Sequence, residues 1–328
     1  MKKNASIITP LFTLIVFGML VASKFAESYI LQTGGNAYLT VIILNVLIFI
    51  IPTLIFCRIK GVGYSKKMNI GLFAPSQFGA ILLSTLFLIC GSALIRYAQV
   101  YLLGLTTVRY SIFNSYINAM PSASMLPLAM AFAVVPAISE ELVFRTIVLT
   151  EYNYGGYGAV PASIGSVVLS SILCLDLEIL PIYVMLGIVC CMITYATGSS
   201  LTAVIVHVLF NCYEIFGEKY VFNAVSNPAN RVTSVFAIGA LFLIFSALMF
   251  ADFERILKVS SVNGTPVPAY VSGEETDAEQ ESVGDEAPGD VVGHGGISRS
   301  FSGFIEIMFS PTMLISVLIF LIMIFGFN

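Results

Sequence analysis

The sequence contains little charge. Only 10% of its 328 residues are Asp, Glu, Lys or Arg, whereas soluble domains usually carry about 25%. So few charges cannot cover a water-facing surface, which excludes an ordinary soluble protein. The chain is instead 58% hydrophobic, with a mean hydropathy of +0.94. Its net charge of −4 gives no indication of nucleic-acid binding, and we expect no nucleic-acid partner.

Metal-binding side chains are also scarce. The six cysteines form no CxxC pair, and all lie in or at the end of apolar stretches, which favours small buried hydrophobes over ligands. Histidine occurs only at His207 and His294, so residues 1–206 contain none. Soft and imidazole ligands are therefore few.

Apolar stretches long enough to cross a bilayer make up most of the chain. A membrane-spanning helix needs about 20 apolar residues. We predict an all-α, multi-pass transmembrane helix bundle of about eight core helices plus one C-terminal accessory helix. The sixth and seventh stretches are short and could pair as a tight hairpin around Gly198. The stretches lie near 8–31, 37–57, 78–104, 123–150, 158–177, 180–197, 200–217, 232–252 and 309–327.

Lysine and arginine set the predicted orientation, because they gather on the cytoplasmic side of membranes. Lys2 and Lys3 precede the first stretch, a basic group follows the second, and Arg255 and Lys258 follow the eighth. All three groups fall on one side of a bundle with these helices. We therefore expect an integral protein of a prokaryotic plasma membrane, with its N-terminus in the cytoplasm and the lipid bilayer as its surroundings.

A polar segment separates the last stretch from the others. Residues 259–298 contain no lysine or arginine and hold eight carboxylates between Glu274 and Asp290. Such a segment cannot bury enough apolar surface to offset its ordering entropy, so we predict a disordered, cytoplasmic acidic linker. The predicted organisation is N-terminal transmembrane helices at 1–120, a core with charged motifs at 121–217, an eighth helix at 218–258, the linker at 259–298 and a C-terminal helix at 299–328.

Three charges interrupt the fourth apolar stretch, although a charge at mid-bilayer costs about 3 kcal/mol on insertion scales. Glu141 and Arg145 have the i, i+4 spacing of a helical ion pair, with the acid in the favourable first position. Glu140 then points about 100° away around the helix and is a candidate general base. Pro136 lacks a backbone N–H and can kink the helix beside these acids.

The seventh stretch contains a second polar pair. His207 and Asn211 are also spaced i, i+4, so both side chains project from one helical face. A single histidine inside a membrane could satisfy a core hydrogen bond and nothing more, but the asparagine one turn away favours a functional set. With Glu140 these groups could hold and polarise a water molecule, or donate to a developing oxyanion.

With these residues the chain resembles the CAAX prenyl protease 2 group of intramembrane endopeptidases, also called the CPBP or Abi family. The family's EExxxR motif corresponds to Glu140, Glu141 and Arg145, and its HxxxN motif to His207 and Asn211. A Thr-Gly-Ser-Ser-Leu turn at 197–201 also fits, and the resemblance covers roughly residues 120–215.

The resemblance implies a metalloprotease-like hydrolase. Glu140 would activate the water that attacks the peptide bond, while Glu141 and Arg145 would support it structurally. His207 and Asn211 would polarise the water or the scissile carbonyl. The implied substrate is a membrane-associated or lipid-modified peptide.

The family's middle motif, FxxxH, is absent. Cys174 stands in place of its phenylalanine and Glu178 in place of its histidine. Glu178 could replace that histidine as a ligand of water or metal, since carboxylates bind Zn²⁺ through oxygen. Alternatively, Asp176 and Glu178 are ordinary interfacial acids that precede Pro181.

The absence of this histidine also leaves the cofactor undetermined. By family resemblance a divalent metal such as zinc is possible, held by Glu140, His207, Asn211 and Glu178. A catalytic zinc normally has three protein ligands, however, and suitable side chains are few here. A metal-free site based on glutamate is equally consistent with the sequence.

Three functions fit these observations. The first is an intramembrane endopeptidase of CAAX type. The second is a catalytically weak or silent member of the family that serves in bacteriocin self-immunity or as a membrane scaffold. The third is a proton-coupled transporter that uses Glu140 as a relay, because intramembrane acids mark such relays. The chain shows no internal repeat of the kind many transporters have.

Overall fold

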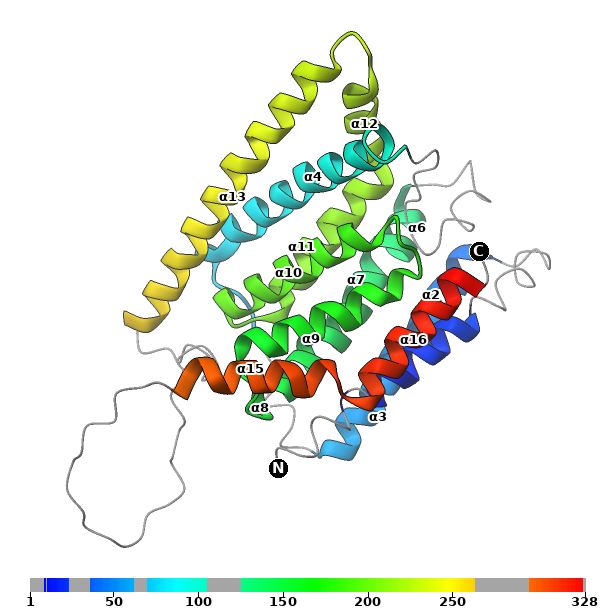
Figure 1. Cartoon of the computed structure of the whole chain (residues 1–328), viewed down its shortest axis with the longest axis vertical. Coiled ribbons are helices and arrows are strands. Elements are labelled where there is room, and N and C mark those ends of the chain that lie inside the picture. Colours follow the sequence, from blue (N-terminus) through cyan, green and yellow to red (C-terminus); the bar gives the residue numbers. More distant parts are fainter. Residues whose placement is uncertain are drawn as a thin grey trace, which may run out of the picture.

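The computed structural model describes residue 9 and residues 11–23, 36–61, 70–104, 125–262 and 295–326. These residues form helices joined by turns, and no strand occurs among them. The chain is an all-α, multi-pass integral membrane protein, as predicted (Figure 1). Six helices are long and apolar enough to cross a bilayer, namely Tyr38–Lys60, Pro75–Tyr101, Met125–Tyr154, Leu180–Thr197, Ser200–Ser226 and Arg231–Val259.

Two of these spans share an unusual local structure before a proline. In the first, α2 (Ala37–Asn45) and α3 (Ile51–Lys60) are joined by the π-helical turn η1 (Val46–Ile50), which ends two residues before Pro52. In the third, η4 (Met130–Val134) ends two residues before Pro136. A proline ring clashes with the carbonyl of the preceding turn, and a wider π turn relieves that crowding. The helix therefore continues through each proline.

The third span carries the predicted acids. It runs without a break through α6 (Met125–Ala129), η4, α7 (Val135–Glu141), a second π-helical segment η5 (Leu142–Val148) and α8 (Leu149–Tyr154). The two π segments flank α7, so the regular helix between them is only seven residues long and ends at the acid pair.

The fifth predicted stretch forms a helix shorter than expected. α9 (Ala159–Ser171) continues as a 3-10 turn, η6 (Ile172–Cys174), and then stops. Leu175 adopts a left-handed backbone conformation, with φ at 49°, and this ends the helix at Cys174. The apolar helix Ala159–Cys174 is thus below the length of an ordinary span.

The predicted hairpin around Gly198 is present. α10 (Leu180–Thr197) ends at Gly198, whose φ of 69° suits glycine, and α11 (Ser200–Cys212) begins after Ser199. The Ser199 side chain caps α11 by accepting a hydrogen bond from the N–H of Leu201. The second helix continues through η7 (Tyr213–Gly217) and α12 (Glu218–Ser226), so it is longer than its apolar stretch predicts.

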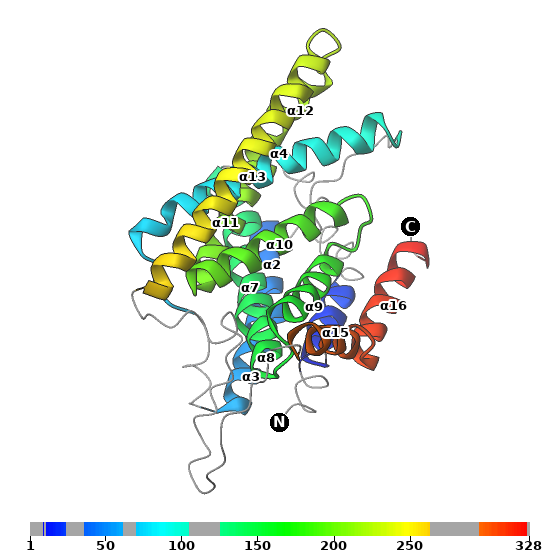
Figure 2. The ribbon, with the colours of Figure 1, turned by 60° about the vertical axis from the view of Figure 1, so that its left-hand side comes forward.

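The remaining helices cover the outside of the bundle. α13 (Arg231–Val262) packs along α4 (Phe78–Tyr101), as both ribbon views show (Figures 1 and 2). At the C-terminal end, α15 (Gly295–Met308) and α16 (Pro311–Gly326) meet at an angle of 55°. α15 packs on α9, where the hydroxyl of Tyr157 donates to Glu306 Oε1 at 2.9 Å.

Parts of the orientation and linker predictions fall outside the described residues. These include Lys2 and Lys3, most of the acidic linker, and His294. The described part of the first apolar stretch is the helix Leu11–Ser23.

α10 lies at the centre of the bundle. One cluster of buried side chains contains Ile179, which immediately precedes α10, and Cys191 within α10. The same cluster contains residues of α9, the third span and the N-terminal helices. A second cluster contains Ile182 and Leu186, together with residues of α4, α11 and α13. Side chains of one helix thus enter both cores, so α10 fixes the position of the two halves relative to each other.

A separate group of buried charges joins α4 to η7 and α12, the segments that follow α11. Arg96 of α4 is 1% exposed and forms an ion pair with Glu214 of η7. Its Nε also lies 3.7 Å from Glu218 Oε1 in α12. One arginine therefore faces two carboxylates, and its removal would leave both acids without this counter-charge inside the protein.

Replacement of this arginine should destabilise the bundle. We expect Arg96→Met to lower the free energy of unfolding by about 3–5 kcal/mol, because breaking a buried ion pair leaves an uncompensated charge. Thermal or denaturant unfolding of the purified chain in detergent measures the change.

The matched control is Glu254→Gln at the exposed pair that Glu254 forms with Lys258 in α13. Water screens that pair, so the substitution should leave the unfolding temperature unchanged. Equal effects of the two substitutions would show that the Arg96 cluster contributes nothing special to stability.

Candidate functional site

The acid pair lies where α7 passes into η5, and all three predicted charges are buried. Glu140, Glu141 and Arg145 are 4%, 0% and 2% exposed. The ion pair that the i, i+4 spacing predicts is present, with Arg145 Nε 3.1 Å from Glu141 Oε2. Arg145 also donates from Nη2 to the backbone oxygen of Gly187 in α10, at 3.2 Å. The guanidinium therefore joins the third span to the central helix.

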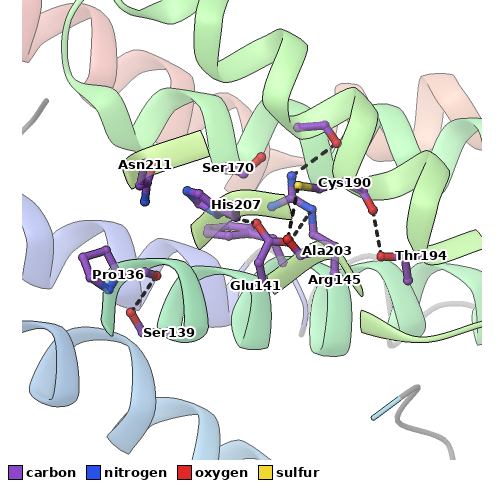
Figure 3. Close-up of polar contacts among 12 residues, drawn as sticks. Pro136, Ser139, Glu141, Arg145, Ser170, Cys190, Thr194, Ala203, His207 and Asn211 are labelled. Carbon is purple, nitrogen blue, oxygen red and sulfur yellow. Dashed lines mark hydrogen bonds and ion pairs between the residues drawn. The ribbon is translucent and has the colours of Figure 1, made fainter. Parts of the chain in front are cut away.

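Glu141 has a second partner that the sequence did not indicate. Its Oε1 lies 2.8 Å from Nδ1 of His207, whose side chain is also buried (Figure 3). An ionised carboxylate can only accept, so the hydrogen lies on Nδ1. Neutral His207 then carries its lone pair on Nε2. Glu141 thus fixes both the orientation and the tautomer of the histidine while it pairs with the arginine.

His207 and Asn211 both face the third span, as expected from their spacing. Asn211 donates from Nδ2 to the backbone oxygen of Ala133 at 3.4 Å, while His207 contacts Glu141. Asn211, the later of the two residues on α11, thus contacts Ala133, the earlier of the two residues on the third span. The two helices therefore run antiparallel.

Glu140 precedes Glu141 by one position, about 100° around the helix, and is buried close to the same charges. It interacts electrostatically with His207, Glu141 and Arg145. Unlike Glu141, it forms no salt bridge with a described residue. Of the two adjacent acids, Glu140 is therefore the one whose carboxylate stays available for another group.

A hydrogen bond fixes the backbone next to Glu140. The Ser139 hydroxyl lies 3.1 Å from Asn45 Oδ1 on α2, and 2.8 Å and 3.0 Å from the backbone oxygens of Val135 and Pro136 in its own helix, so three acceptors share its single hydrogen. Both side chains are buried. The two helices that contain a π turn before a proline thus meet immediately beside the acid.

α10 closes the opposite side of the site. Gly187 lies where Arg145 approaches, and a Cβ atom there would be 3.3 Å from Ser170 Oγ and 3.4 Å from Arg145 Nη2. One turn further along, the Cys190 thiol lies against Glu141 and points at the backbone oxygen of Ala203 at 3.9 Å (Figure 3). Small side chains on this face allow α10 to approach the charges closely.

Glu178 is in the turn between α9 and α10, four residues beyond Cys174 and after the left-handed Leu175. Its N–H donates to Asp176 Oδ1 at 2.8 Å and its backbone oxygen accepts from Gln99 near the end of α4. The backbone contacts of Glu178 therefore connect this turn to α4. Its carboxylate oxygen Oε2 is buried and has no hydrogen-bond partner in the described residues.

The donor set does not fit a three-ligand metal centre. No group of three His, Cys, Asp or Glu side chains with metal-binding geometry occurs among the described residues. Both oxygens of Glu141 and one nitrogen of His207 already have protein partners. Glu140, Asn211 and the other histidine nitrogen are left, which is fewer His, Cys or carboxylate ligands than catalytic zinc normally has.

The site lies within a segment that matches a known protein family. Residues 122–213 match the family model described as type II CAAX prenyl endopeptidase, Rce1-like. This segment is Rce1-like. The match confirms the resemblance that the two motifs indicate, and both motifs lie inside it. No curated protein and no solved structure shows a significant match to the chain.

The Rce1-like segment contains site residues that sequence reasoning missed. The link from Glu141 to His207 joins positions 66 residues apart, and no local spacing reports it. Gly187 and Cys190 appear in the sequence as ordinary residues of an apolar helix. Arg96, Glu214 and Glu218, which lie outside this segment in the separate charged cluster, did carry a signal, since charges within or beside apolar stretches are unusual.

The close approach of α10 should be essential to the charged cluster. We expect Gly187→Leu to destabilise the protein by about 1–3 kcal/mol, because the added atoms meet Ser170, Val167 and Arg145 at once. Unfolding in detergent measures this loss.

Gly239→Leu on α13 is the matched control, because a Cβ there meets nothing within 4 Å. It should be neutral or slightly stabilising, since leucine favours helix more than glycine does. A Gly187→Leu variant as stable as wild type would show that the approach of α10 is not tight.

Proposed function

We propose that the chain is an intramembrane endopeptidase of CAAX prenyl protease 2 type that hydrolyses membrane-associated or lipid-modified peptides. The observation that carries the proposal is that two adjacent buried acids differ in their ion-pair partners. Glu141 is paired with Arg145 and His207, and Glu140 has no ion-pair partner among the described residues. The match of residues 122–213 to the Rce1-like endopeptidases supports the same reaction.

In this proposal Glu140 is the general base. Its carboxylate accepts a proton from a water molecule as the water oxygen attacks the peptide carbonyl carbon. The carbonyl π electrons move to the oxygen, and the proton on Glu140 then passes to the leaving nitrogen as the C–N bond breaks. A base positioned in this way contributes typically about 10²–10⁴-fold to the rate.

The other site residues position this chemistry. Glu141 holds the His207 imidazole with its Nε2 lone pair free to accept a hydrogen bond from the attacking water. Arg145 neutralises Glu141 and joins it to α10, which keeps the histidine fixed. Asn211, one turn from His207, supplies amide hydrogens on the same face of α11.

The bilayer supplies the substrate. A farnesyl or other lipid chain partitions into the hydrocarbon around the six apolar spans, which concentrates the attached peptide at the membrane beside the helices that carry the site. This setting suits an enzyme whose acid and base groups are buried within membrane helices.

Loss of the proposed base should abolish cleavage. We expect Glu140→Gln to lower kcat about 10²–10⁴-fold, because an amide cannot accept the proton of water. The measurement follows cleavage of a farnesylated peptide with a C-terminal Cys-aliphatic-aliphatic-X sequence and a fluorophore–quencher pair, using the full chain in liposomes. His207→Ala should also lose most of the activity.

Glu151→Gln is the matched control. Glu151 is a largely buried carboxylate of the same span, but it pairs with Lys60 at 2.5 Å and lies in α8. Its conversion to an amide should leave kcat close to the wild-type value. If Glu140→Gln cleaves the peptide as fast as Glu151→Gln does, the protease assignment to this site is wrong.

Chelation should distinguish a metal-dependent reaction from the glutamate-based one proposed. The described donor set lacks three suitable ligands, so we expect 1,10-phenanthroline to leave kcat unchanged. A zinc-dependent peptidase assayed in the same liposomes serves as the positive control. Inactivation by the chelator, reversed by added Zn²⁺, would contradict this expectation.

A further inference from the structure

The face of α10 that contacts the charged cluster extends one turn beyond Gly187. Gly187 accepts from Arg145, and Cys190 lies against Glu141, so both positions face the third span. Residues four apart share a helical face. Tyr183, four residues before Gly187, therefore faces the third span as well.

The direction of the helices sets the level at which Tyr183 lies. α11 runs antiparallel to the third span, because His207 contacts Glu141 while Asn211 contacts Ala133. α10 runs antiparallel to α11 within the hairpin. The third span and α10 are therefore parallel. α9 runs antiparallel to α10, and hence to the third span. Its Ser166 donates to the backbone oxygen of Phe144 at 3.0 Å and its Ser170 lies opposite Gly187, so Gly187 is level with the backbone of Glu140.

α9 places a third residue at this level. Ser170 lies opposite Gly187, and Cys174 is one turn further along α9, which runs antiparallel to α10. Cys174 and Tyr183 thus lie one turn nearer the N-terminal end of the third span than the Glu140 backbone, on the side toward which a helical side chain tilts. The electrostatic interactions agree, because Glu140 acts on both the Tyr183 hydroxyl and the Cys174 thiol.

The Tyr183 hydroxyl is available for a ligand. Cys174 already points its thiol at the backbone oxygen of Asp176, at 3.1 Å. The Tyr183 hydroxyl, in contrast, has no hydrogen-bond partner within the described parts of the chain. The hydroxyls of Tyr38, Tyr152 and Tyr213 are likewise without a hydrogen-bond partner in the described residues. What distinguishes Tyr183 is its place beside a buried acid, where its free donor can bind a third group, such as substrate or water.

We propose that Tyr183 is a catalytic residue that donates a hydrogen bond to the oxyanion of the tetrahedral intermediate, beside Glu140, where this chain lacks the FxxxH histidine. The inference rests on the proposed endopeptidase function. Glu178, which occupies the histidine's place in the sequence, connects through its backbone to α4. The tyrosine of α10 therefore supplies a donor beside the acid that does not depend on the end of α9.

The step balances without a cofactor. As the water oxygen bonds to the carbonyl carbon, Glu140 takes the water proton and the carbonyl oxygen gains the electron pair. The phenol keeps its own proton throughout and stabilises the negative oxygen by donation. Collapse of the intermediate restores the C=O bond, breaks the C–N bond and moves the proton from Glu140 to the amine.

Tyr183→Phe in the full chain in liposomes tests the proposal with the farnesylated peptide. We expect kcat to fall about 10²–10³-fold, as for other oxyanion donors, with KM little changed because the donor acts mainly in the transition state. The unfolding temperature should not fall, since the hydroxyl forms no bond with the described residues.

Tyr195→Phe provides the crossed control on the same helix. The Tyr195 hydroxyl bonds Asn153 Oδ1 at 3.1 Å and the backbone oxygen of Ala159 at 3.2 Å. Its loss should lower the unfolding temperature but leave kcat unchanged. The two tyrosines thus separate a catalytic hydroxyl from a structural one.

The outcomes distinguish the two levels of the proposal. If Glu140→Gln abolishes cleavage while Tyr183→Phe has wild-type kcat, the tyrosine assignment is overturned and the endopeptidase stands. If Tyr183→Phe loses kcat only in proportion to lost folded protein, its role is structural and the assignment also fails. If the wild-type chain cleaves no prenylated or unmodified membrane peptide, both proposals are overturned.

Discussion

The site depends on one buried carboxylate with two partners. Glu141 is completely buried, yet one oxygen pairs with Arg145 and the other with His207. Through these two partners a single side chain connects the third span to α10 and to α11. An isolated ion in hydrocarbon would be costly, so neither partner can move away without leaving a buried charge behind. The requirement to satisfy Glu141 therefore holds three helices in one arrangement, directly beside Glu140, the proposed base.

The backbone around this carboxylate is irregular for a physical reason. Pro52 and Pro136 each remove a helical hydrogen bond, and a π turn precedes each of them. A further π segment begins directly after Glu141. Such turns change the angular position of side chains relative to a regular helix. Glu140 and Glu141 themselves lie in the regular helix α7, about 100° apart, between the two π segments. The Ser139–Asn45 contact keeps the two irregular helices aligned there. The same regular helix without these turns would present its acids at different angles to α10 and α11.

Local patterns in the sequence were sufficient to predict much of the fold and part of the site. Apolar length identified the membrane bundle, the i, i+4 spacing identified the Glu141–Arg145 pair, and Gly198 identified the hairpin. The short fifth helix was missed because a left-handed Leu175 has no clear sequence signature. The Glu141–His207 contact was missed because it depends on how two helices pack. For the same reason Tyr183 attracted no attention, since a tyrosine in an apolar helix is ordinary until its neighbours are known.

The absence of the FxxxH histidine does not by itself imply an inactive protein. The interactions that orient His207 run through Glu141 and Arg145, and the end of α9 takes no part in them. A change at that end therefore leaves Glu140, the proposed base, and the imidazole in place. Both α9 and α10 pack beside the third span next to Glu140, so a side chain can approach this acid from α10 as readily as from α9. A hydroxyl of Tyr183 on the central helix, which both cores hold in position, is better fixed than a carboxylate in a turn such as Glu178. Rigid support is the property that an oxyanion donor requires, because its contribution depends on being in place before charge develops.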